Sequence, residues 1–439
     1  MYKYFPHTEN DLKAMMDVVG ISSMDELYAE VPEQIRFSGD YDIPSEMSEI
    51  EVRRHFEQLG AQNRQLTCFA GAGVYDHYTP AVIPQLLSRS ELLTSYTPYQ
   101  AEISQGTLHY IFEYQSMMTE LTGMDISNAS MYDGSTATAE AMMMAVAAGK
   151  KQNRVLISET VDPKVLAVVR TYAHFHGIGI DIIPAKDGVT DLQHLQHLLN
   201  LQPLQYAAVL VQQPNYYGIV EDYSGFADAA HGAKALFVMN SAIADLAVLK
   251  TPAEWGADIA VGDGQSLGIP MQWGGPYVGY MCCTDKLIRK MPGRIVGKTV
   301  DSRGQRAFVL TLQAREQHIR RQKATSNICS NQSLMALFVT VYCSLMGRQG
   351  LKEAANLSYA GAHYLCERLL ATGHFKLVYD KPFFNEFVVS YDGDVDALQQ
   401  RFIDNGILGG IKLNDNQLMF AVTERRTKEE INSLVSLVL

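Results

Sequence analysis

The stretch Val261–Pro276 combines residue types and spacing that suit chemistry beside an exposed backbone. It reads Val-Gly-Asp-Gly-Gln-Ser-Leu-Gly-Ile-Pro-Met-Gln-Trp-Gly-Gly-Pro and follows a run of buried-strand character, Ala257–Val261. Glycine has no Cβ and takes positive φ readily, so a glycine-rich turn lets the backbone come close to a bound group. We expect this loop to lie at the functional centre of an α/β enzyme. The alternative is a structural turn between two strands.

In enzymes that use pyridoxal phosphate (PLP), a loop of this kind carries the lysine whose amine forms an imine with the cofactor aldehyde. Gln265 occupies the position where that lysine would be expected. A carboxamide cannot form an imine with an aldehyde. The loop therefore lacks the group that would hold such a cofactor covalently.

A second candidate for binding is the stretch Thr94–Thr107, which is dense in polar side chains and shows no helical periodicity. Loops of this composition often supply binding residues, so we expect a site-lining loop in preference to a plain surface loop. Its candidate residues are Tyr96, Tyr99, Gln100, Glu102 and Gln105. Farther upstream, Tyr75, Asp76, His77 and Tyr78 either line a pocket or form a hydrogen-bonded turn.

Gly134, Ser135 and Thr136 stand at the start of an alanine- and methionine-rich helical stretch. Unpaired N–H groups and hydroxyls at a helix N-terminus suit a phosphate, as a PLP site requires. Serine and threonine also cap ordinary helices, which is the alternative for these three residues.

A basic cluster, Arg315–Asn327, opens what we expect to be a helix after Gln313. Such a run is usually a solvated or salt-bridged surface. In an acidic protein it can instead receive an acidic partner. The docking candidates are Arg315, His318, Arg320 and Arg321.

The elements that must position these residues follow an α/β pattern. Short β-rich runs alternate with helical stretches between Arg154 and Trp255, which indicates a mainly parallel sheet with both faces covered. The runs are Val155–Ile157, Gly179–Ile183, Ala207–Val211 and Ala235–Val238. We expect three parts: a helical N-terminal arm (1–65), a large domain (66–345) and a small α+β C-terminal domain (346–439). This layout is that of fold-type I PLP-dependent transferases.

Composition excludes several classes of function. The 439 residues carry a net charge of -12, which argues against binding nucleic acid. Six scattered cysteines form neither a zinc nor a disulfide framework, so no metal is expected. No segment reaches the ~18 consecutive apolar residues of a membrane span, and the N-terminus has no signal-peptide core. We expect a cytoplasmic protein with no membrane partner.

Together these stretches resemble the P-protein family of the glycine cleavage system, specifically subunit 1 of the two-chain glycine dehydrogenase (decarboxylating). The resemblance covers essentially the whole chain and depends on long motifs of the family. They are Tyr4–Thr8, Gly71–Tyr78, Tyr96–Thr107, Ala129–Gly134, Val261–Gln265, Arg315–Arg320 and Lys323–Ile328.

The resemblance implies a division of labour between two subunits. In the family, subunit 2 carries a His-Lys pair five residues ahead of a Pro-His-Gly-Gly-Gly-Gly-Pro run. Aligning that run with Pro270–Pro276 places Gly264 and Gln265 opposite His-Lys. PLP is then expected on subunit 2 and not on this chain. Asn240 and Ser241 agree with this, since neither supplies the acid that keeps the pyridine ring protonated.

The family implies that the complex, a heterodimer assembled as a heterotetramer, decarboxylates glycine and passes the aminomethyl group to the lipoyl arm of H-protein. This chain would supply part of the site wall through the Thr94–Thr107 loop, and its basic cluster would help to dock the acidic H-protein. Two positions depart from the family pattern: Asp162 stands where histidine is expected and Ala101 where proline is expected.

Two alternatives from other classes remain open at this point. One is a self-sufficient PLP-dependent aminotransferase or decarboxylase that uses a lysine elsewhere, such as Lys250 or Lys298. The other is a non-catalytic scaffold subunit.

Overall fold

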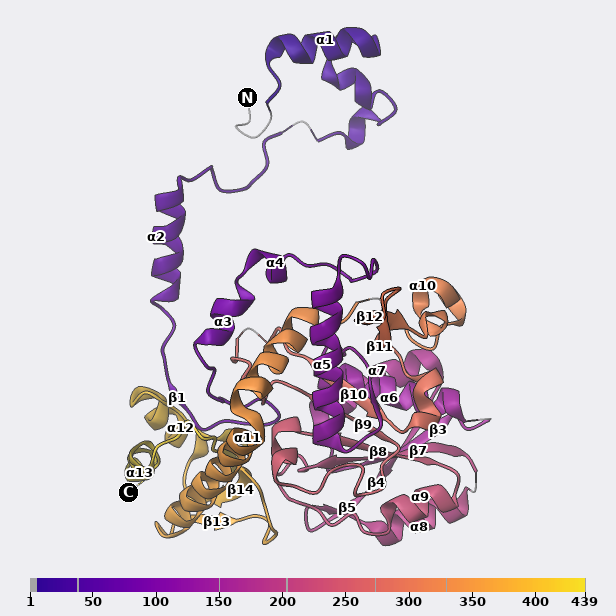
Figure 1. Ribbon diagram of the computed structural model, residues 1–439. Helices are drawn as coiled ribbons and strands as arrows, with labels where there is room; N and C mark the ends of the chain where they lie inside the picture. Colours follow the sequence, from indigo (N-terminus) through magenta and orange to yellow (C-terminus); the bar gives the residue numbers. More distant parts are fainter. Residues whose placement is uncertain are drawn as a thin grey trace. The chain divides into compact units, whose positions relative to one another are not determined.

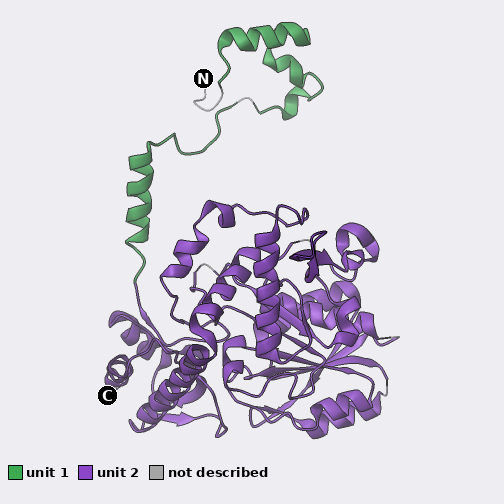
Figure 2. Cartoon of the chain, viewed as in Figure 1, with its two compact units in different colours: residues 1–64 green, residues 65–439 purple. Residues whose placement is uncertain are grey.

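The computed structural model describes residues 6–37, 39–149, 151–202, 204–272, 274–328 and 330–438. The chain divides into two compact units, Met1–Arg64 and Gln65–Leu439, which Figure 2 distinguishes by colour. The first residues of the Tyr4–Thr8 motif, Trp273 of the glycine-rich loop and Cys329 lie outside the described residues.

The first unit is helical, as its sequence pattern predicts. It contains α1 (Glu9–Val19), α2 (Glu49–Gly60) and two short 3-10 helices, η1 (Met24–Tyr28) and η2 (Glu33–Ile35). Both α-helices begin with a capping box, formed by Thr8 with Asp11 and by Ser48 with Glu51. None of the four helices buries a residue, so the unit exposes the apolar side chains that its helices place on one face.

The second unit is built on a seven-stranded sheet with strand order β2-β10-β9-β8-β7-β3-β4 (Figure 1). The five strands β9, β8, β7, β3 and β4 are parallel, while β10 runs antiparallel to both β9 and β2. Their bounds are β2 (Ile126–Ser127), β3 (Arg154–Ser158), β4 (Gly179–Ile183), β7 (Tyr206–Gln213), β8 (Leu236–Ser241), β9 (Ile259–Asp263) and β10 (Gly279–Cys283). The predicted mainly parallel sheet is confirmed.

Helices cover both faces of this sheet and bury two separate cores. One core packs α6 (Gly134–Ala148) and α7 (Pro163–His176) against the sheet. The other core contains apolar residues of α8 (Leu192–Leu201) and α9 (Phe226–Gly232). This arrangement explains why the strands are apolar on both faces. Two small pairs, β5 (Ala185–Lys186) with β6 (Val189–Thr190) and β11 (Ile295–Val300) with β12 (Arg306–Thr311), lie outside the main sheet.

A third core joins α5 (Gln105–Thr122) to the first part of α11 (Ser333–Leu370), near the short helices α3 (Val82–Leu87) and α4 (Ser90–Leu93). The 38-residue α11 is the one helix of the described residues that is long and apolar enough to cross a membrane. Its apolar side chains pack into protein cores on both sides of a kink at Gly347, where φ is 58°. Burial in these cores accounts for its composition.

The last part of the chain forms an α+β lobe. Its antiparallel sheet has the order β13 (Phe375–Leu377), β14 (Glu386–Tyr391), β17 (Gln417–Ala421), β16 (Ile411–Asn414). The second part of α11, α12 (Val395–Asp404) and α13 (Lys428–Ser436) bury the core of this lobe. Short strand β1 (Thr67–Cys68) pairs in parallel with β15 (Ile407–Leu408). The start of the second unit is thus joined to its end.

Candidate active site

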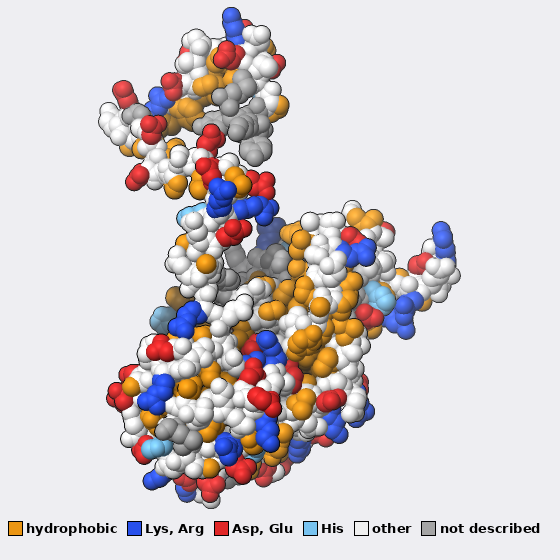
Figure 3. Space-filling view, turned by 90° about the vertical axis from the view of Figure 1, so that its left-hand side faces the viewer, with side chains coloured by type: hydrophobic (Ala, Val, Ile, Leu, Met, Phe, Trp, Pro, Cys, Tyr) orange, Lys and Arg blue, Asp and Glu red, His pale blue; other side chains and the backbone are white. Residues whose placement is uncertain are grey.

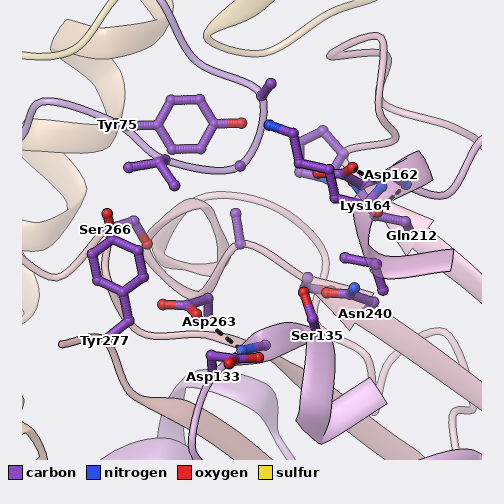
Figure 4. Close-up of a pocket in the computed structure, with 18 of the residues that line it drawn as sticks. Tyr75, Asp133, Ser135, Asp162, Lys164, Gln212, Asn240, Asp263, Ser266 and Tyr277 are labelled. Carbon is purple, nitrogen blue, oxygen red and sulfur yellow. Dashed lines mark hydrogen bonds between the residues drawn. The ribbon is translucent and has the colours of Figure 1, made fainter. Parts of the chain in front are cut away.

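A cavity of about 420 Å³ opens at the carboxyl ends of the parallel strands, where α/β proteins usually bind ligands. Figure 4 shows Asp133 and Asp263 on one side of it and Asp162 and Lys164 on another. The lining comes from the loop before α3, the starts of α6, α7 and α11, the strand ends, the glycine-rich loop and the start of β14. Its polar residues include Tyr75, Asp133, Ser135, Asp162, Lys164, Gln212, Asn240, Ser241, Asp263, Ser266, Tyr277, Gln332, Asn385 and Glu386.

Gln265 is 1% exposed and its carboxamide is fully used by the protein itself. Its Oε1 accepts from the Tyr75 N–H at 3.0 Å. Its Nε2 donates to the carbonyls of Tyr75 at 2.7 Å and Ile269 at 2.8 Å. The side chain therefore joins the glycine-rich loop to the loop that carries Tyr75. At this position the structure has a buried structural amide and no reactive amine.

The predicted phosphate-binding turn at the start of α6 is already occupied by a carboxylate. Asp263, the last residue of β9, accepts from the Gly134 N–H at 2.9 Å and from the Gln265 N–H at 2.8 Å. Asp133 is the N-cap and accepts from the Thr136 N–H at 2.8 Å. The Thr136 hydroxyl also bonds to Asp133. A phosphate here would meet two carboxylates in place of free N–H groups.

Gly134 must be glycine for this contact to form. A Cβ at that position would lie 2.7 Å from the Asp263 nitrogen and 2.9 Å from the Gly262 carbonyl carbon. Such approach is closer than van der Waals contact permits. Ser135, the remaining phosphate candidate, lines the cavity.

Burial disfavours the ionised form of the carboxyl groups in this cavity wall. Burial raises the pKa of Asp263 to about 7 and that of Glu386 to about 7. Burial also raises the pKa of Asp162, the N-cap of α7, which accepts from the Lys164 N–H at 2.8 Å. Asp162 thus adds an acidic residue to the cavity wall. Asp162, Asp263 and Glu386 meet at this cavity through contacts between distant segments, which no local sequence pattern predicts.

The Tyr75–Tyr78 cluster serves both of the purposes predicted as alternatives. Tyr75 lines the cavity, and its hydroxyl donates to Glu386 Oε2 at 3.0 Å. Asp76 pairs with Arg425 and Arg426, and His77 Nδ1 lies 2.7 Å from Glu424 Oε2. Buried alone, Glu424 would have a raised pKa, but its bonds to His77 and to the Tyr78 N–H lower it. These pairs hold the Tyr75 loop against the C-terminal lobe.

Asn240 and Ser241 end β8 beside the cavity. Asn240 Nδ2 donates to the Thr138 hydroxyl at 3.3 Å, so its amide is held by α6. The Ser241 hydroxyl oxygen is buried and has no hydrogen-bond partner among the described residues. Neither side chain can supply a carboxylate.

Of the described lysines, only Lys164 lines the cavity. Lys250 Nζ lies 3.6 Å above the Trp255 ring, and Lys298 borders a different surface hollow between α5 and the β11–β12 pair. The two lysines considered as alternative cofactor anchors are therefore not in this cavity.

The residues present do not fit PLP. The expected lysine position holds a hydrogen-bonded amide, the helix N-terminus holds Asp263, and the end of β8 holds Asn240. Each of the three groups that such a cofactor needs is replaced by one that serves the protein's own packing.

The predicted site-lining loop lies apart from this cavity, and none of its five candidate residues lines it. Tyr96 is 79% exposed, Tyr99 is 49% exposed, and Gln100 and Glu102 are also exposed. Gln105 instead points inward, where its amide bonds to the Ala101 carbonyl and to the backbone of Phe308 on both sides. Four of the five candidates are thus exposed, while Gln105 fixes the start of α5 to β12.

The basic segment differs from the expected helix. It consists of short turns, η5 (Gln313–Arg315), α10 (Gln317–Arg320) and η6 (Arg321–Lys323), and the helix breaks at Arg321, where φ is 52°. Arg315 points inward and donates to the carbonyls of Met291 and Gly293. His318, Arg320 and Arg321 remain exposed.

Comparison with known proteins gives the family. Residues 2–438 match the family model described as "Glycine cleavage system P-protein". A protein of Anoxybacillus flavithermus, "Probable glycine dehydrogenase (decarboxylating) subunit 1", is 47% identical over 444 residues, with 99% of this chain and 98% of that protein covered. A protein of the same name from Carboxydothermus hydrogenoformans is 48% identical over 445 residues, with 99% of each covered.

Solved structures agree. The crystal structure of glycine decarboxylase (P-protein) of the glycine cleavage system, in inhibitor-bound form, superposes with a TM-score of 0.91 at 42% identity and covers 100% of this chain and 99% of its own. A glutamate decarboxylase of Lactobacillus brevis superposes with a TM-score of 0.67 at 13% identity over 94% of this chain and 97% of its own, which shows the shared fold alone.

Proposed function

The chain belongs to the P-protein family of the glycine cleavage system, and from this premise we propose that it is the subunit of a two-chain glycine dehydrogenase (decarboxylating) that shapes the reaction site without holding the cofactor. Subunit 2 of the complex holds PLP. Together the two chains decarboxylate glycine and transfer the aminomethyl group to the lipoyl arm of H-protein, in the cytoplasm, as a heterotetramer.

The observation that carries this proposal is the pairing of Gln265 with the backbone of Tyr75 and Ile269. A side chain with three such bonds is a structural part of this chain and is not free to take part in catalysis. With Asp263 on the α6 N-terminus, it makes the inherited cofactor pocket part of the scaffold. PLP, when bound by subunit 2, supplies the electron sink for loss of CO2.

This chain then contributes surface. Tyr96, Tyr99, Gln100 and Glu102 form an outward-facing polar loop that can complete a site on a neighbouring chain, orient glycine and exclude water from it. Exposed hydrophobic side chains gather in patches on the face that Figure 3 presents. Large exposed apolar surfaces commonly mark protein interfaces.

The first unit supports the same proposal. Its helices expose Leu12, Met15, Val19, Phe56 and Leu59 without burying them within the unit. Amphipathic helices gain most of their stability from packing the apolar face. We propose that subunit 2 covers these faces.

The docking surface for H-protein comprises His318, Arg320 and Arg321. Arg315 is removed from this set because its guanidinium bonds to buried carbonyls. Exposed guanidinium groups attract an acidic partner and accelerate its association, with a strong dependence on salt.

The decisive experiment is co-purification with subunit 2, followed by glycine–bicarbonate exchange with each chain omitted in turn. We expect exchange only with both chains present. Full exchange by subunit 2 alone would identify this chain as a scaffold. In a second measurement the isolated chain is mixed with PLP and treated with borohydride. Covalent coenzyme on Lys164 or any other lysine of this chain would refute the proposal.

Within the complex, Tyr96→Phe and Glu102→Ala should each lower turnover while leaving assembly intact. Gel filtration of the reconstituted complex provides the control for assembly. Full activity in both variants would remove this loop from the site.

A further inference from the structure

Arg294 is a buried guanidinium that has no carboxylate partner among the described residues. It stands immediately before β11, is 3% exposed, and takes part in no ion pair with a described residue. Nη2 donates to the Tyr99 hydroxyl at 3.1 Å, and Nη1 reaches Asn331 Oδ1 only at 3.5 Å. Nε is buried without a hydrogen-bond partner. Burial of a charge without a partner is strongly unfavourable, so a group that balances this charge is expected beside it.

Tyr99 lies between this charge and the solvent. The Arg294 guanidinium carbon is 5.3 Å from the centre of the Tyr99 ring, yet the tyrosine is 49% exposed. Its oxygen accepts from Arg294, and no described residue accepts its own proton. A phenol that accepts from a guanidinium is a stronger donor, because the adjacent positive charge favours loss of electron density from its O–H bond. The hydroxyl can therefore present the buried charge to an anion at the surface.

The supporting residues are held rigidly. Asn331 Nδ2 donates to the Ala129 carbonyl at 3.2 Å and to the Ser130 hydroxyl at 3.0 Å. Ser130 adopts φ of 143°, a conformation that side-chain-bearing residues rarely take, and its oxygen also accepts from the Gln332 N–H. Strain of this kind persists only where the surroundings impose it. Asn331, whose Oδ1 faces Arg294 Nη1 at 3.5 Å, therefore has a fixed position.

We propose that Arg294 and Tyr99 form a receptor for the carboxylate of a small amino acid, in which Tyr99 is the accessible donor and Arg294 the buried countercharge. One buried positive charge and one hydroxyl on a half-exposed tyrosine match a monoanion. A phosphate would need more donors, and the net charge of -12 opposes polyanions. That this carboxylate is the one of glycine rests on the proposed function above.

The test compares Tyr99→Phe, Arg294→Gln and Arg294→Lys in the reconstituted two-subunit complex. Tyr99→Phe and Arg294→Gln should raise KM for glycine and the inhibition constant of acetate together, by about ten- to a hundredfold, the value of a hydrogen bond to a charged group. Arg294→Lys keeps the charge and should recover part of the loss. Tyr359→Phe is the matched control, because Tyr359 is 45% exposed and its hydroxyl has no hydrogen bond with a described residue, while its ring contacts His363 and Phe384.

Unchanged KM and unchanged acetate inhibition in folded Tyr99→Phe and Arg294→Gln would overturn the proposal. So would weaker subunit association at unchanged KM, since the anion would then belong to the partner protein. A second measurement follows the tyrosine Cζ resonances of the isolated full chain during titration with acetate. The Tyr99 signal should move in the native chain and stay still in Arg294→Gln. If the chain binds acetate but the complex shows no glycine exchange, the proposed function is refuted, while the Arg294–Tyr99 carboxylate receptor is still supported.

Discussion

Replacing Gln265 by leucine tests whether this residue is a structural element of the second unit. The substitution leaves the Tyr75 N–H and the carbonyls of Tyr75 and Ile269 without their partners in a buried place. A buried backbone group left without a partner costs about 1–3 kcal/mol, so the loss for three groups is about 3 kcal/mol at the lower end of that range. For a unit of this size, with an unfolding entropy of roughly 2.1 cal/mol/K per residue, the apparent Tm should fall by about 4 °C.

The assay is thermal and urea unfolding of the full chain, followed by circular dichroism. Gln272→Leu is the matched control, because Gln272 lies in the same loop, is exposed and has no side-chain hydrogen bond among the described residues. We expect a change of less than about 0.5 kcal/mol for the control. A Gln265→Leu variant as stable as the Gln272→Leu variant would refute the structural role. Gln265→Lys should also be destabilised and should not bind PLP, because Asp263 still occupies the helix terminus.

Three further predictions follow from contacts at the cavity and on the surface. Burial raises the pKa of Glu386 from an ordinary 4.5 to about 7, so the folded state keeps a proton that the unfolded state loses. The free energy of unfolding should therefore fall as the pH rises from about 4.5 to 7. Urea unfolding of Glu386→Gln at several pH values should show a smaller fall. Gly218→Ala should destabilise the chain by more than about 3 kcal/mol or prevent its folding, because a Cβ there would lie 1.9 Å from the Glu386 carbonyl oxygen at φ of 79°, and yield and unfolding midpoint report it. Arg320→Glu with Arg321→Glu should raise KM for H-protein several-fold at low salt and little at high salt; equal effects at both would exclude electrostatic docking.

The fold could be predicted from sequence because its signals are local. Each parallel strand is a short apolar run such as Ala207–Val211, and several helices begin with a side-chain cap, as at Thr8 and Asp133. Gln265 could also be interpreted from sequence, because imine chemistry requires an amine and the residue type alone excludes it. These conclusions need no knowledge of distant contacts.

The direction of side chains could not be predicted in the same way. Gln105 and Arg315 belong to polar motifs, yet both turn inward to bond backbone carbonyls. Asp263 reaches the start of α6 across more than a hundred residues, and Glu386 reaches the cavity from a different lobe. No local sequence pattern predicts these long-range contacts. The basic segment failed as a predicted helix because Arg321 takes a positive φ there.

The pairing of β1 with β15 has a consequence for biosynthesis. Thr67 and Ile407 are neighbours in a two-stranded parallel ladder, so the edge that Thr67–Cys68 offers stays unpaired until Ile407 and Leu408 have left the ribosome. Loop closure over such a length is costly, and open strand edges in a nascent chain invite aggregation. A truncated translation product ending before Ile407 would carry that open edge permanently and should be recognised by chaperones or degraded.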